Sequence, residues 1–123
     1  MAVVAFALPV LPGQEDLVRS IGEAFSGSGE LREGYEESRK RLGIREEKVW
    51  LQRTPIGHSI IVYWQTEDPQ HTLREMANAQ NEVDKKFRQV IENAAPAIDL
   101  SAENPLSNEL LFEWQQQGVS ENL

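Results

Sequence analysis

The sequence contains no cysteine, and this absence excludes disulfides, thiolate metal sites and thiol nucleophiles. Histidine is almost as scarce, because the chain has only His58 and His71, too few for a zinc site without added carboxylates. No apolar run approaches the roughly 18 residues that a membrane helix needs, and no basic segment precedes the apolar N-terminus. We therefore expect a cytoplasmic protein with no bound metal and no membrane contact.

Positive charge is also in short supply. Twelve Lys and Arg residues stand against twenty Asp and Glu, which gives a formal net charge of -8. This balance argues against a nucleic-acid partner, because DNA and RNA present dense negative charge. With 123 residues, 40% hydrophobic and 26% charged, the composition is that of one soluble domain with its own core. We expect a single domain over residues 1–115 and a polar tail over residues 116–123.

Hydrophobic spacing predicts alternating strands and helices along the chain. Short apolar or β-branched runs predict strands over residues 3–10, 48–53, 58–65 and 108–115. Stripes with helical spacing predict helices over residues 14–25, 30–42 and 69–94. In the last of these helices, Asn78 and Asn81 are the expected place of any kink or break.

This order predicts an α+β fold, the ferredoxin-like βαββαβ arrangement with a four-stranded antiparallel sheet and both helices on one face. The strands contain enough apolar residues to need cover on their second face as well. A second copy of the chain is the simplest cover for such a face. The sequence therefore predicts a homodimer that forms through the sheet face.

Four segments carry a family resemblance, at residues 5–13 (AFALPVLPG), 35–44 (YEESRKRLGI), 49–57 (VWLQRTPIG) and 111–114 (LFEW). In them the chain resembles the dimeric α+β barrel superfamily, and more narrowly small bacterial members of its antibiotic-biosynthesis-monooxygenase-like group. The resemblance implies a dimeric α+β barrel with a small-molecule-sized cavity between sheet and helices. It implies no assigned catalytic residue and no particular reaction. We expect no cofactor.

The turn between residues 54 and 57 decides which side chains share a face of the sheet. Proline followed two residues later by Gly57 suits a three-residue loop with a glycine bulge. That register places Trp50, Gln52, His58 and Trp64 together on one face. A two-residue turn would instead move His58 and Trp64 to the opposite face.

Aromatic and polar residues of this hairpin are candidates for a binding site. Trp50 and Trp64 with Gln52 form an aromatic wall with a polar group, as a pocket for a planar ligand requires. Both tryptophans equally fit the role of core or dimer-interface anchors. His58 is a weak candidate for a general base, since its ordinary pKa lies near neutrality.

A second candidate pair lies on the helix predicted over residues 30–42. Tyr35 and Arg39 are four residues apart, so they lie on one face of that helix. Arginine at the edge of an apolar stripe is suited to bind a carboxylate or phenolate, with Tyr35 as a further ligand contact or a weak catalytic candidate. The alternative is structural, with the tyrosine hydroxyl held by the arginine.

Two functions remain open at this level. One is a small-molecule-binding homodimer with cofactor-independent monooxygenase-like or isomerase-like activity on an aromatic or polyketide-like compound. The other is a non-catalytic binding or interaction dimer whose cavity is filled by its own aromatic residues. They differ in whether space remains between sheet and helices once the aromatic side chains are packed, namely Trp50, Trp64, Phe87 and Phe112.

Overall fold

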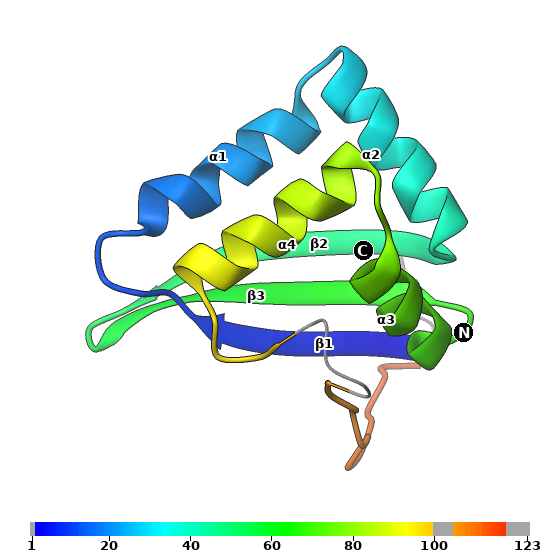
Figure 1. Cartoon of the computed structure of the whole chain (residues 1–123). Coiled ribbons are helices and arrows are strands. Elements are labelled where there is room, and N and C mark those ends of the chain that lie inside the picture. Colours follow the sequence, from blue (N-terminus) through cyan, green and yellow to red (C-terminus); the bar gives the residue numbers. More distant parts are fainter. Residues whose placement is uncertain (1, 100–104, 118–123) are drawn as a thin grey trace.

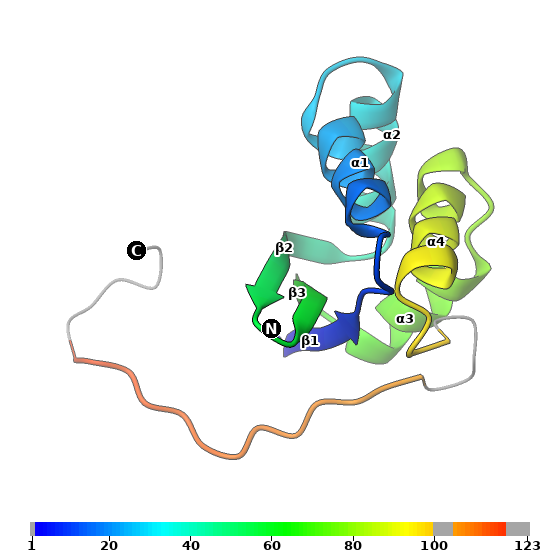
Figure 2. The same ribbon diagram turned by 90° about the vertical axis from the view of Figure 1, so that its left-hand side faces the viewer.

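The structure is a computed structural model that describes residues 2–99 and 105–117. A three-stranded antiparallel sheet in the order β1-β3-β2 is covered by helices on one face (Figures 1 and 2). The elements follow the chain as β1 (Ala2–Pro9), α1 (Glu15–Ser26), α2 (Glu30–Arg41), β2 (Ile44–Thr54), β3 (Gly57–Thr66), α3 (Pro69–Asn78) and α4 (Glu82–Ala94). Within the described ranges, no helix is both long enough and apolar enough to cross a membrane.

The two faces of the sheet differ in cover. Along β1, Val4, Phe6 and Leu8 are buried beneath the helices, whereas the residues between them are exposed. Alternation of this kind results because successive strand side chains point to opposite faces. The predicted strand over residues 3–10 is confirmed, but in the single chain the helices cover only one of its faces.

Amphipathic stripes dock the helices on the inner face of the sheet. The buried residues of α1 are Val18, Ile21 and Phe25. Two shorter helices replace the one predicted over residues 69–94, and the break falls at the expected asparagines. There the Asn81 side chain caps α4 by accepting a hydrogen bond from the Asp84 backbone N–H at 2.9 Å.

The predicted fourth strand over residues 108–115 is absent, so the four-stranded ferredoxin-like sheet is wrong, and the sheet has three strands. Instead, the Asn108 side chain occupies the free edge of β1. It accepts from the Ala5 N–H at 2.9 Å and donates to the Ala5 C=O at 2.7 Å. A strand-like composition means only that the side chains of a segment fit a sheet. To become a strand, the segment also needs a neighbouring strand whose backbone N–H and C=O groups are free to pair. Most of the predicted tail over residues 116–123 lies outside the described residues.

The predicted register of the β2–β3 hairpin is also wrong. Thr54 pairs with Gly57 across a two-residue turn, and Arg53 therefore pairs with His58. Gly57 has a φ of 149°, far from the left-handed value near +60° that the predicted bulge requires. Trp50 and Trp64 consequently lie on opposite faces of the sheet, since a shift of one residue exchanges the faces.

Candidate functional site

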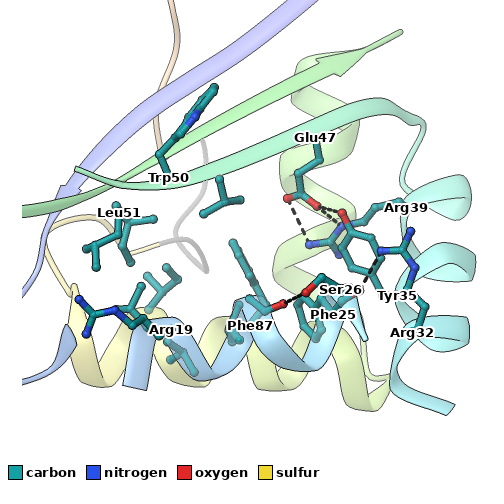
Figure 3. Close-up of a pocket in the computed structure, with 17 residues that line it drawn as sticks. Arg19, Phe25, Ser26, Arg32, Tyr35, Arg39, Glu47, Trp50, Leu51 and Phe87 are labelled. Atoms are coloured by element: carbon teal, nitrogen blue, oxygen red, sulfur yellow. Dashed lines mark hydrogen bonds and ion pairs between the residues drawn. The ribbon is translucent and has the colours of Figure 1, made fainter. Parts of the chain in front are cut away.

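A cavity of about 260 Å³ lies between the sheet and the helices α1, α2 and α4 (Figure 3). Its walls are mainly apolar side chains, namely Val18, Ile21 and Phe25 of α1, Val49 and Leu51 of β2, Ile60 of β3, and Phe87, Val90 and Ile91 of α4. Gly22 of α1 also borders this space. A Cβ placed on Gly22 would meet no other atom within 4 Å.

One end of the cavity is polar and is organised around Glu47, whose side chain is only 5% exposed. The Tyr35 hydroxyl and the Arg39 Nε both donate to Oε1 of this carboxylate, at 2.6 and 2.8 Å. Its second oxygen, Oε2, accepts a hydrogen bond from the Trp64 indole N–H at 2.5 Å. Both oxygens of the buried carboxylate are thus engaged by donors from α2 and β3, and Figure 3 shows the two donors from α2, Tyr35 and Arg39.

Behind Arg39 lies a second buried carboxylate, that of Asp84 in α4, which is fully shielded from solvent. Arg39 Nη1 donates to its Oδ1 at 3.0 Å, and Arg41 Nη2 donates to its Oδ2 at 2.7 Å. Ser38 Oγ and Asn81 Nδ2 complete the set at 2.6 and 2.8 Å. Two arginines therefore balance two buried carboxylates, as burial of charge requires.

Close packing of α2 against α4 brings the groups of this network within hydrogen-bond distance of one another. Gly34 of α2 lies so near to α4 that a Cβ on it would be 3.0 Å from Val83 Cγ2. The missing side chain lets the two helices approach closely, so that Ser38 and Arg39 reach Asp84.

Electrostatics fix the protonation states of the two polar residues that α2 supplies. Burial, together with the negative charge of Glu47, raises the pKa of Tyr35 to about 12. Burial on its own would lower the pKa of Arg39, but the neighbouring Glu47 charge outweighs it and the pKa is raised. At neutral pH, Tyr35 is consequently a neutral hydrogen-bond donor and Arg39 is a cation.

The raised pKa of Tyr35 predicts a loss of stability at alkaline pH. A tyrosine whose pKa is higher in the folded state contributes stability below its ordinary pKa of about 10 and loses it as pH rises toward 12. We expect the difference in phenolate absorbance between the wild type and Tyr35→Phe to have its midpoint near pH 12. Circular dichroism along the same titration monitors the fold. A difference curve centred near the ordinary value of about 10 would contradict the described hydrogen bond to Glu47.

The candidate residues from the sequence occupy three different places. Tyr35, Arg39 and Trp64 meet around Glu47. Trp50 borders the cavity at its rim, but its indole points to the other side of β2 (Figure 3). Gln52 and His58 are not among the residues that line the cavity.

Two of these residues have surroundings of their own. Gln52 pairs with Ser59 in the hairpin register and lies exposed on the outer face of the sheet. His58 Nδ1 lies 3.1 Å from Glu15 Oε1, at the beginning of α1. The pKa of Glu15 is lowered, first by a hydrogen bond from its own backbone N–H and further by this pairing with His58.

Sequence reasoning missed both buried carboxylates, although each had a readable signal. Glu47 lies two residues before Val49 and four before Leu51, so strand alternation places all three on the inner face. Asp84 is the third residue after the helix cap Asn81, a spacing typical of a reciprocal cap.

No known protein family, no curated protein and no solved structure matches this chain. In the part of the chain that the structure describes, no group of three or more histidine, aspartate or glutamate side chains is arranged to hold a metal ion. The cavity and its polar end are therefore the features from which a function is inferred.

Proposed function

We propose that the protein binds a small, largely apolar and planar organic molecule in the cavity between its sheet and helices. The observation that carries this proposal is the cavity of about 260 Å³, with apolar walls and one polar end. Space of this kind remains although Trp64 and Phe87 are already packed in the core. This favours a ligand site over a cavity filled by the protein's own aromatic residues.

The polar end favours a ligand with a neutral head group. Arg39 is balanced by Glu47 and Asp84, so no uncompensated charge faces the cavity from this network. Arg32 lies at the rim, 5.4 Å from the centre of the Tyr35 ring, and is already paired with Glu36 at 2.9 Å. The remaining cation of the lining, Arg19, is paired with Asp16 at 2.9 Å, so a charged ligand would lose its hydration without gaining a free counter-ion, whereas a hydroxyl or carbonyl loses much less.

The same geometry favours binding over turnover. Abstraction of a proton by Glu47 would first require its hydrogen bonds from Tyr35, Arg39 and Trp64 to break. Tyr35, with a pKa of about 12, holds its own proton at neutral pH. The remaining candidate base, His58, is paired with Glu15 and does not line the cavity.

A series of ligands with one shape and different charges tests this proposal. Naphthol, naphthoate and naphthylmethylammonium share a planar apolar body and differ in the charge of the head group. We expect naphthol to bind once per chain and at least about tenfold more tightly than the two ions. Fluorescence titration gives the affinities, and native mass spectrometry gives the stoichiometry. Equal affinity for all three probes, or no binding of any of them, would contradict the proposal.

We further propose that the binding protein is a homodimer formed through the outer face of the sheet. On this face Val3 and Trp50 are 43% and 49% exposed, although both are large and apolar. Ile61 and Tyr63 of the central strand lie on the same face and are only partly covered. A second copy would cover this face through a symmetric, self-complementary contact.

A further inference from the structure

A second uncovered apolar surface lies on the segment of residues 109–115. It carries four large apolar residues, Leu110, Leu111, Phe112 and Trp114, and in a fully extended chain Leu110, Phe112 and Trp114 share one side. The exposed fractions of these four are 75%, 81%, 85% and 79%, although exposed apolar residues of this size rarely cluster without a partner. Glu109 precedes these residues, Glu113 lies between Phe112 and Trp114, and both glutamates are exposed.

The Asn108 side chain fixes the start of this segment at the edge of β1, whereas residues 109–115 after it are exposed. Both backbone groups of Ala5 that face this edge are occupied by the Asn108 side chain. A ladder between the segment and its own β1 would have to displace this amide. Figure 2 shows the chain after this point running past β1 and away from the sheet. Its apolar residues therefore have little cover from the part of the chain that the structure describes.

The outer face of the sheet is shaped to receive large side chains. On β1 the outward residues Ala5 and Ala7 are small and exposed, and they lie opposite Tyr63 and Ile61 of β3. Small residues beside larger ones leave shallow space in which an aromatic ring packs without a backbone shift. Trp50 borders the same surface on the other side of β3, next to Ile61.

We propose that in the homodimer the segment of residues 109–115 of each copy lies across the outer sheet face of the other. Leu110, Phe112 and Trp114 then pack over the alanines of β1 and over Ile61. This inference rests on the proposed dimer and adds the segment that covers the outer sheet faces within it. The partner is a second copy of the chain, because each copy carries both the segment and the sheet face. A two-fold axis lets each copy place its segment on the sheet face of the other.

The area that a stable dimer needs supports an exchange of segments. Standard interfaces bury about 800 Å² on each partner. A sheet face rich in alanine contributes little by itself, whereas each aromatic residue buries roughly 150–250 Å². In a symmetric dimer, Phe112 and Trp114 each contribute buried area twice, once from each copy. In the extended arrangement Glu109 and Glu113 point away from this contact and stay in solvent.

Engineered disulfides test the exchange directly, because the chain has no cysteine of its own. One chain carries Phe112→Cys and the other, isotopically labelled, carries Ile61→Cys. After the two are mixed and oxidised, we expect a disulfide-linked pair with one chain of each mass. A double variant whose two cysteines link only within one chain would overturn the exchange, since the segment would then lie on its own sheet.

Sedimentation of full-length variants at micromolar concentration separates the exchange from the dimer itself. We expect Phe112→Ser with Trp114→Ser to weaken dimerisation at least tenfold, while circular dichroism stays unchanged. Ile56→Ser is the matched control, because Ile56 is 99% exposed at the hairpin turn and lies outside the segment. If the double variant dimerises like the control, the exchange is wrong and the sheet-face dimer stands. A monomeric wild type would overturn both.

Discussion

Asp84→Ala is expected to lower the free energy of unfolding by about 3–5 kcal/mol, the range measured when one partner of a buried ion pair is removed. The Asp84 carboxylate has no solvent exposure and accepts hydrogen bonds from Ser38, Arg39, Arg41 and Asn81. Its loss would leave the buried Arg39 cation with Glu47 as its remaining charged partner. It would also remove the side-chain partner of the cap at the beginning of α4.

Two further variants show whether burial causes this loss. Asp84→Asn keeps the shape and one acceptor oxygen, so we expect a loss between that of the alanine variant and the wild type. Asp16→Ala removes a comparable pair, but Asp16 is 96% exposed and bonds Arg19 at the surface, so its effect should stay below about 1 kcal/mol. Urea unfolding of all three variants gives the comparison. If Asp84→Ala and Asp16→Ala cost the same, the buried network does not carry the stability assigned to it.

Gly22→Phe is expected to abolish naphthol binding, with an affinity loss of at least about 100-fold, or about 2.7 kcal/mol. Gly22 lies on the α1 stripe of Val18 and Phe25 and borders the cavity. A Cβ at this position meets nothing within 4 Å, so a phenylalanine ring has room to enter the space that the ligand would occupy. The backbone is helical here, and replacing glycine within a helix does not strain it.

The matched control is Gly22→Ala, which changes the helix but leaves most of the cavity open. We expect it to stabilise the fold by about 0.5–1 kcal/mol, because glycine is the more flexible residue in the unfolded chain. Its naphthol affinity should remain within a few-fold of the wild type. The measurement is the fluorescence titration used for the wild type, with thermal unfolding alongside. A folded Gly22→Phe variant that still binds naphthol with wild-type affinity would place the probe outside this cavity.

The two experiments address different layers of one site. The apolar walls define the volume and are supplied mainly by α1, β2 and α4. The network of Arg39 with Glu47 and Asp84 holds the polar end and joins α2 to β2 and α4. Loss of the network should therefore reduce stability first, whereas filling the volume should reduce ligand affinity with the fold intact.

Local spacing in the sequence was sufficient for much of this protein. Amphipathic stripes predicted α1 and α2, and β-branched runs predicted β1, β2 and β3, because these signals depend on neighbours within a few residues. The break between α3 and α4 also fell where two asparagines interrupt the helical pattern. Tyr35 and Arg39 were chosen because their four-residue spacing places them on one helix face, and both line the cavity.

What local spacing left undetermined involves partners that are distant in sequence. One residue of hairpin register moved Trp64 to the inner face and Trp50 to the outer one, since strand faces alternate with every residue. The strand-like segment of residues 109–115 has no ladder, because Asn108 takes the edge of β1 that a fourth strand would need. Strand alternation and helix capping could indicate where Glu47 and Asp84 lie, but both pair with Arg39 only because helix packing brings it between them, and no pattern of neighbouring residues encodes that meeting.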